Sequence, residues 1–290
     1  MKKNLESELV LNKHGRLYHI NTQENSLAKD IILVGDPGRV DMVASFFSKV
    51  THSSSNREIF SKTGLYKGKE ISVISTGMGV DNIDIVLTEI DAAFNMDLET
   101  KQEKEDKTSL NLIRLGTSGA MHKEIPTGSF LASQYSVGLD GIMYFYDLPK
   151  DVINKEASES FIRYMDWGKD LPKPYFVEAS NHLLEKIAFD MEKGITATSP
   201  GFYGPQGREI RLPLAYPEIN SILPKFLYNN VRMMNYEMET SAIYAIAKSL
   251  NHSALTVCLV IANRESGEFL NDYSNEMRNL IEVVLERIIK

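Results

Sequence analysis

The sequence DIILVGDPGR at residues 30–39 combines a short apolar run with a glycine-containing turn. Ile31–Val34 is rich in branched aliphatic residues, which is typical of a buried strand. Asp36 can cap a following helix that has Pro37 at its first position. Apolar residues then recur at helical spacing at Val40, Val43, Ala44 and Phe47. The stretch therefore predicts a strand, a tight turn and a helix in succession.

The same order of strand, loop and helix recurs along the chain. Further apolar runs end in short polar loops, at Ile71–Ile74, Leu112–Leu115 and Ala254–Ile261. Apolar residues recur at helical spacing within 83–90, 242–250 and 277–289. This alternation favours an α/β fold with a largely central sheet.

Two stretches interrupt the alternation. Asp97–Lys107 (DLETKQEKEDK) is a run of charges, which predicts a solvated loop. Met143–Pro174 is mixed, aromatic and charged, and carries no clear element. Neither has the Gly/Ser/Pro composition of an interdomain linker. We therefore predict a single domain over residues 1–290, in which about 1–17 form an N-terminal extension.

Composition excludes several classes of protein. The chain has 290 residues with 32 basic and 39 acidic side chains, a net charge of −7 that disfavours nucleic-acid and anionic-membrane partners. Cys258 is the single cysteine, which fits a reducing compartment. The first residues lack the apolar run of a signal peptide, and the longest strongly apolar run, 254–262, is too short to span a membrane. These features predict a soluble cytoplasmic protein.

Two glycine-containing turns carry arginines and suit an anion. In GDPGR at 35–39, backbone N–H groups at a helix start lie next to Arg39. In RLGTSG at 114–119, Arg114 precedes two hydroxyl side chains at a strand end, and open α/β sheets bind ligands at that edge. Each could instead be a plain turn, with Arg39 on the surface and Arg114 in a structural ion pair.

Two later motifs suit a nucleoside. In FYGPQGR at 202–208, aromatic rings, an amide and a guanidinium can bind the face and the polar edge of a flat heterocycle. In NYEMET at 235–240, Glu239 can accept hydrogen bonds from a vicinal diol such as that of ribose. The alternatives are a self-packed Ω-loop and an ordinary acidic helix N-terminus.

Other chemistries have weaker signals. The TGMG sequence at 76–79 has only Gly-x-Gly, and Asn82 stands where a dinucleotide fingerprint has its third glycine. The chain contains no phosphate-binding P-loop, and its histidines show no metal-ligand spacing. Cys258 lies within a strand-like run, which predicts a buried inert thiol. We therefore expect neither a metal nor an organic cofactor.

Taken in order, these segments resemble the nucleoside phosphorylase I family, and most closely its uridine-cleaving members. The resemblance extends from about Tyr18 to the C-terminus and rests on the ordered set GDPGR, REIF, STGMG, RLGTSGA, FYGPQGR, NYEMET and VIANR. It implies a single α/β domain whose central mixed sheet partly closes into a barrel and is flanked by helices.

The resemblance also implies a role for each matching residue. The phosphate would be bound by Gly35, Arg39, Arg57, Arg114, Gly116, Thr117 and Ser118, of which Arg57 would serve the neighbouring subunit. The ribose would be bound by His19, Glu237, Met238 and Glu239, of which His19 would reach the 5′-hydroxyl across the same interface. The base would be bound by Phe202, Gln206, Arg208 and Arg264. The catalytic residues implied are Arg114, Arg208 and Glu239.

The implied reaction is phosphorolysis of the N-glycosidic bond of uridine, and of deoxyuridine as a further substrate, in pyrimidine salvage. Inorganic phosphate is the co-substrate, attacking a sugar carbon with oxocarbenium character. Purine-cleaving relatives generally place an aspartate in the loop after the last strand, where this chain has VIANRE at 260–265.

Alternatives stay open at the level of the sequence. The chain could be a purine nucleoside or methylthioadenosine phosphorylase of the same family, or a noncatalytic nucleoside-sensing module. The shared site implies a homo-oligomer, at least a dimer, and a hexamer is compatible with the resemblance. The stretches 97–107 and 143–174 look longer than in common family members, and either could alter the contacts between subunits.

Overall fold

A computed structural model describes residues 6–23 and 25–290. Its main feature is a long mixed sheet. In hydrogen-bonded order the strands are β11 (Leu227–Tyr228), β12 (Val231–Glu237), β10 (Glu192–Thr198), β8 (Phe130–Gly138), β13 (Ser253–Asn263), β7 (Asn111–Ala120), β1 (Asp30–Val34), β4 (Lys69–Ser75), β3 (Ile59–Tyr66) and β2 (Lys49–Asn56). β9 (Tyr175–Glu178) pairs with β8.

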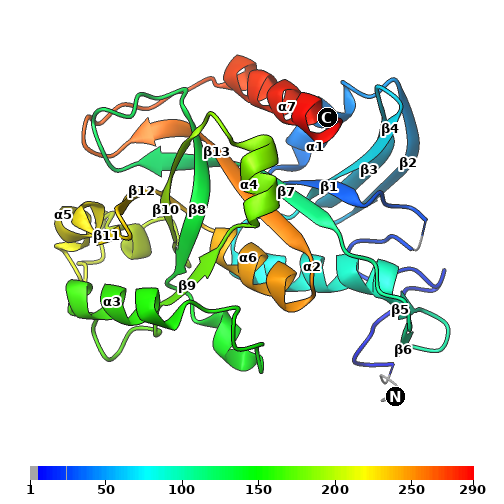
Figure 1. The fold of residues 1–290 in the computed structure, drawn as a ribbon, viewed down its shortest axis with the longest axis horizontal. Coiled ribbons are helices and arrows are strands. Elements are labelled where there is room, and N and C mark those ends of the chain that lie inside the picture. The colour runs from blue at the N-terminus through cyan, green and yellow to red at the C-terminus, as the bar shows by residue number, and fades with distance from the viewer. Residues whose placement is uncertain (1–5, 24) are drawn as a thin grey trace.

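One half of the sheet closes on itself. β12 pairs with β7 as well as with β10, through Asn235 opposite Ala120 and Tyr236 opposite Gly119. The strands β12, β10, β8, β13 and β7 therefore form a barrel, and β1, β4, β3 and β2 continue from β7 as an open sheet (Figure 1). This confirms the predicted single α/β fold with a partly closed sheet.

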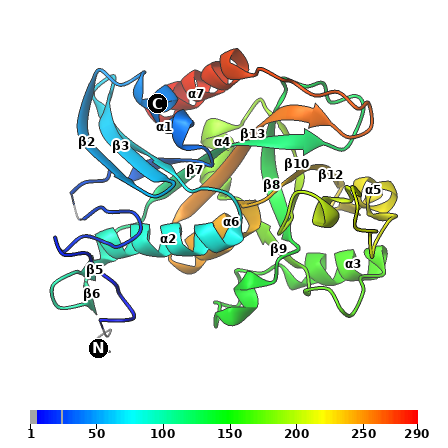
Figure 2. The ribbon, with the colours of Figure 1, turned by 180° about the vertical axis from the view of Figure 1, so that it is seen from behind.

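Helices cover the sheet on both sides (Figures 1 and 2). They are α1 (Pro37–Ala44), α2 (Val80–Asn95), α3 (Lys155–Met165), α4 (Asn181–Ile187), α5 (Ile219–Ile222), α6 (Thr240–Ser249) and α7 (Ser274–Ile288). Short 3₁₀ turns are η1 (Ile142–Phe145), η2 (Gly204–Gln206) and η3 (Leu223–Lys225). The predicted strand and helix at 30–44 are confirmed, and the Asp36 carboxylate accepts a hydrogen bond from Gly38 N at 2.8 Å as the helix cap.

The structure corrects the boundary predicted after Leu115. Residues 116–119 were expected as a glycine-flanked loop, but β7 continues through them to Ala120. The reason is the second partner of β7, because Gly119 pairs with Tyr236 on one side and Ala262 on the other. The RLGTSG motif at 114–119 is therefore part of a strand that belongs to the barrel.

The charge run is also only partly a solvated loop. It contains a short hairpin, β5 (Met96–Asp97) with β6 (Gln102–Glu103). Lys101 between them is buried, and its Nζ donates to Glu6 Oε2 at 2.7 Å and to the Leu9 carbonyl at 2.9 Å. Buried ammonium groups need such partners. This hairpin therefore packs against the N-terminal segment.

The unassigned stretch 143–174 contains η1 and α3. Its anchor is Phe161, which is fully buried and whose ring centroid lies 5.1 Å from that of Phe226 and 5.7 Å from that of Phe176. The stretch thus packs against the barrel through an aromatic cluster.

Among the described residues, no helix is both long and apolar enough to cross a membrane.

Candidate active site

A cavity of about 780 Å³ opens where the parallel strands β1, β4 and β7 have their carboxyl ends. This is the edge at which open α/β sheets bind ligands. Predicted residues from four separate motifs line it: Gly35, Arg39, Arg114, Thr117, Ser118, Phe202, Gln206, Arg208, Glu237, Met238 and Glu239. The fold therefore brings the predicted phosphate, sugar and base groups to one place.

The end of the cavity near α1 offers unpaired hydrogen-bond donors. Arg39 donates from Nη1 to the Leu115 carbonyl at 3.1 Å, but its Nε has no partner. Arg114 Nε and Ser118 Oγ are buried and unpartnered as well. Burial, and next the charge of Arg114, lowers the pKa of Arg39. Buried donors and repelling cations together favour a bound anion, which would satisfy both.

Arg114 lies on β7 between two carboxylates. Its Nη2 donates to Glu239 Oε2, and its Nη1 lies 3.4 Å from Glu237 Oε2. Burial lowers the pKa of Arg114, but Glu239 and Glu237 raise it and prevail, so the guanidinium is charged. A Cβ at Gly116 would lie 1.9 Å from Arg114 Nη1. Glycine at 116 therefore makes room for this guanidinium, although it does not line the cavity itself.

The predicted inert thiol is confirmed as a buried side chain. Cys258 Sγ lies 3.5 Å from Arg114 Nη1 and is fully buried. Burial raises the pKa of Cys258 to about 12. The thiol is therefore protonated at neutral pH and is not a nucleophile.

Glu239 presents its carboxylate to the cavity. Its Oε1 accepts a hydrogen bond from Gly79 N at 2.7 Å, and its Oε2 accepts from Arg114. Burial raises the pKa of Glu239, although Arg114 opposes the effect. Glu237 has different partners, because it accepts from Glu239 N at 2.8 Å and from Thr240 N at 2.9 Å. Its ribose role stays a prediction, since these contacts already use its carboxylate to hold α6.

The far end of the cavity is formed by the turn at 202–208. Arg208 Nη1 donates to Gln206 Oε1 and to the Phe202 carbonyl, each at 2.6 Å, and its guanidinium carbon lies 3.8 Å from the Phe202 ring centroid. Burial and the nearby charge of Arg264 lower the pKa of Arg208 to about 10. Arg264 donates from Nη2 to the Gln206 carbonyl at 2.9 Å, so it supports this turn from outside the cavity lining.

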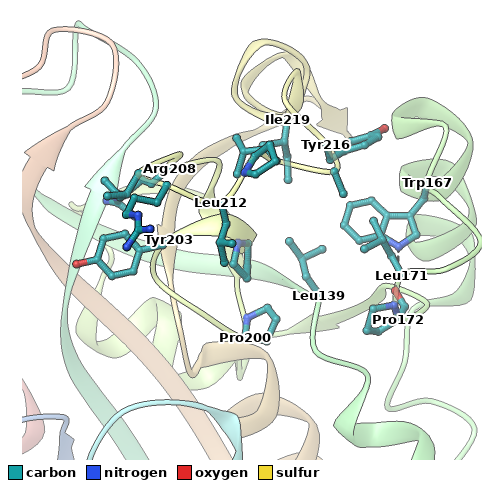
Figure 3. A pocket seen from close by; sticks show the side chains of 17 residues that line it. Leu139, Trp167, Leu171, Pro172, Pro200, Tyr203, Arg208, Leu212, Tyr216 and Ile219 are labelled. Atoms are coloured by element: carbon teal, nitrogen blue, oxygen red, sulfur yellow. Dashed lines mark hydrogen bonds between the residues drawn. The ribbon is translucent and has the colours of Figure 1, made fainter.

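A second cavity, of about 700 Å³, lies on the other side of the same turn (Figure 3). Its walls are mainly apolar and include Leu139, Trp167, Leu171, Leu212 and Ile219. Arg208 and Tyr203 stand at its edge, so one turn separates the two cavities. The stretch 143–174 thus contributes part of the support behind the base end.

Arg57 and His19 lie outside the cavity lining. Arg57 is exposed at the turn between β2 and β3, with a φ of 52°. His19 Nδ1 lies 2.6 Å from Glu89 Oε1 on α2. Asn56 Nδ2 donates to the His19 carbonyl at 3.0 Å, which ties the two segments together. The segments of the two residues expected to serve a neighbouring subunit are therefore in contact.

Sequence reasoning left several lining residues without a role. Met78, Asn82, Tyr236 and Phe269 line the cavity, and Gly79 orients Glu239 through its amide. For Met78 and Asn82 the signal was the glycine pair after β4, which ends at the same sheet edge as β1. Across residues 6–23 and 25–290, no cluster of three or more His, Cys, Asp or Glu side chains is placed to hold a metal ion.

Comparison with known proteins gives consistent matches. The model of the phosphorylase superfamily matches residues 29–290. The chain is similar to a uridine phosphorylase from Thermococcus kodakarensis, at 29% identity over 93% of this chain and 85% of the relative. It is also similar to a purine nucleoside phosphorylase from Bacillus cereus, at 27% identity over 94% and 98% of the two chains.

Among solved structures, a Trypanosoma brucei nucleoside phosphorylase described as showing uridine phosphorylase activity superimposes with a TM-score of 0.86. It is 31% identical, and the match covers 97% of this chain and 99% of that one. The likeness therefore includes the barrel, the open sheet and the segments that line the cavity.

Proposed function

We propose, because this chain belongs to the phosphorylase superfamily, that it cleaves uridine with inorganic phosphate to uracil and ribose 1-phosphate. One observation carries the proposal: Arg39 Nε, Arg114 Nε and Ser118 Oγ are buried donors without partners, and they line the cavity that also contains the Glu239 carboxylate. A bound anion accepts hydrogen bonds from the unpaired donors, and a sugar bound beside it donates hydrogen bonds to the Glu239 carboxylate. The uridine-active relatives support the choice of nucleoside.

The geometry supports a mechanism without covalent catalysis by the protein. Arg39 and Arg114 hold phosphate at one end, and Glu239 accepts hydrogen bonds from the ribose hydroxyls. A phosphate oxygen bonds to C1′ as the C1′–N1 bond breaks, through a transition state with oxocarbenium character. The electron pair of the broken bond moves onto uracil, which then takes up the proton that the hydrogen phosphate group gives up. Arg208 and Gln206 stabilise the negative charge on the departing base by preorganised hydrogen bonds.

The loop after β13 supports a pyrimidine base. Asn263 stands at the end of β13, and both of its polar atoms are engaged: Nδ2 donates to the Ile125 carbonyl at 2.8 Å and Oδ1 accepts from Glu265 N at 3.0 Å. Arg264 turns toward the carbonyl of Gln206. Asn263 and Arg264 are therefore not acids that could protonate a purine at N7, and Glu265 accepts from Lys123 N at 2.9 Å and lies outside the cavity lining.

The first test is a substrate panel. Purified protein is incubated with uridine, deoxyuridine, thymidine, inosine, adenosine or methylthioadenosine, with and without phosphate. Uracil release from uridine that depends on phosphate is the expected result. Release that is unchanged without phosphate excludes phosphorolysis, and a preference for inosine over uridine excludes the pyrimidine assignment.

We further propose that the protein acts as a homo-oligomer in the cytoplasm, in pyrimidine salvage, with phosphate as co-substrate and with no metal or organic cofactor. Donation of both side chains to a neighbouring subunit is supported by their position outside the cavity lining and by the contact between their two segments. The test mixes two inactive variants, Arg57→Ala and Arg114→Ala, by co-expression. Mixed oligomers then contain complete sites, so activity should return in part. Absence of any recovery in confirmed mixed oligomers contradicts the sharing.

A further inference from the structure

Helix α6 starts at the active site, but its own N-cap side chain does not cap it. Glu239 is the N-cap residue, and its carboxylate makes no hydrogen bond to the first turn of α6. An N-cap side chain ordinarily accepts from the amide two or three residues later. Here the Glu239 carboxylate instead contacts Arg114 and Gly79 N.

The first turn of α6 is capped from two strands of the barrel. Glu237, at the end of β12, accepts from the amides of Glu239 and Thr240. Thr198, at the end of β10, accepts from Ser241 N at 3.0 Å. The Thr198 hydroxyl also donates to Glu237 Oε1 at 2.5 Å. Of these amides, Ser241 N is the one that the Glu239 carboxylate would contact as an N-cap, and it is satisfied by Thr198.

Water cannot take over this capping function. Thr198 and Ser241 are fully buried, and Glu237 is 3% exposed. A buried amide without a partner is costly, so it recruits an acceptor that can reach it. Glu239 can supply this acceptor, because it precedes Ser241 by two residues and already occupies the N-cap position.

We propose that Thr198 is a positioning residue for the phosphorolysis proposed above. By occupying Ser241 N, its hydroxyl keeps Glu239 from folding back onto its own helix. The Glu239 carboxylate is thereby left free for Arg114 and the ribose. The inference rests on the proposed function for its kinetic consequence, but the position of Glu239 can be tested without any nucleoside.

The variant Thr198→Val removes the hydroxyl and keeps the shape of the side chain. The variant loses the hydrogen bond from the Thr198 hydroxyl to Glu237 and leaves Ser241 N without its acceptor. These losses should lower kcat for uridine by about 10- to 100-fold. Phosphate affinity, measured by calorimetry with inorganic phosphate alone, should be unchanged or tighter, because Arg114 loses a competing carboxylate. Thr198→Ser should restore kcat, since it returns the hydroxyl.

The matched control is Thr196→Val. Thr196 lies two residues earlier on β10, is 1% exposed, and donates to Asn235 Oδ1 at 2.8 Å rather than to a group at α6. Thr196→Val also removes a buried hydroxyl, so the thermal stability of this variant should fall as it does in Thr198→Val. Its kcat should stay near that of the wild type.

Several results would overturn the proposal. They are a wild-type kcat in Thr198→Val, a loss of phosphate affinity as large as the loss of turnover, or a Thr198→Ser variant no better than Thr198→Val. If Thr198→Val does not fold, the comparison of Thr198→Ser with Thr198→Ala isolates the same hydroxyl. If the wild type does not cleave uridine, the proposed function fails, and a crystal structure of Thr198→Val still decides whether Glu239 moves onto Ser241 N.

Discussion

Replacing Arg208 by alanine should separate base activation from phosphate binding. The Arg208 guanidinium holds Gln206 Oε1 and the Phe202 carbonyl and stacks on the Phe202 ring, all at the base end of the cavity. Loss of one preorganised donor to a developing anion costs about 100- to 1,000-fold in kcat. Phosphate affinity should change little, because Arg39 contacts the Leu115 carbonyl and Arg114 contacts Glu239, away from this turn.

The assay measures uracil release by chromatography under saturating phosphate, and phosphate affinity by calorimetry. Arg211→Ala is the matched control, because Arg211 is an exposed arginine three residues later that lines the apolar cavity and not the candidate active-site cavity. It should retain wild-type turnover. An equal loss of turnover and phosphate affinity in Arg208→Ala would refute the assignment of Arg208 to the base, and so would an equal loss of turnover in both variants.

Three further predictions concern pH, the phosphate strand and the aromatic cluster. Since the pKa of Arg208 is lowered to about 10, the guanidinium is charged below that pH, and turnover should fall as the pH rises through about 10; a pH–rate profile with no alkaline decline there contradicts this. Gly116→Ala places a Cβ 1.9 Å from Arg114 Nη1, so overpacking should destabilise the fold by about 1–3 kcal/mol and weaken phosphate binding, as seen by thermal unfolding and calorimetry. Phe161→Ala should lower the free energy of unfolding in urea by about 3–5 kcal/mol, because Phe161 is fully buried among aromatic rings, and a smaller loss than that of an exposed Phe145→Ala control would be incompatible with its place in the cluster.

Much of the site could be predicted from local sequence because each motif lies on a strand or shortly after one. The turns after β1 and β4, and the arginine on β7, all lie at one edge, since parallel neighbours end together. Arg39 and Arg114 are therefore close in space although they are far apart in the chain, and Glu239 joins them through its contact with Arg114. Local patterns could not decide whether FYGPQGR at 202–208 forms a base site or a self-packed loop. The base site was predicted only from the order of all the motifs along the chain.

Features that depend on distant partners could not be predicted. The extension of β7 through Gly119 requires β12, more than a hundred residues later, to pair with it. The burial of Lys101 requires Glu6 as its partner. The contacts of Glu237 follow from the position of the first turn of α6, which no pattern within NYEMET specifies. Such contacts are set by tertiary packing, so local composition alone could not predict them.

The double engagement of β7 restricts how the enzyme can open. β7 is hydrogen-bonded within the barrel, to β13 and β12, and within the open sheet, to β1. A hinge motion between the two halves would have to break one of these ladders. We therefore expect substrate entry and product release to involve exposed side chains that line the cavity, such as Met78 and Phe269, rather than a separation of the two halves of the sheet.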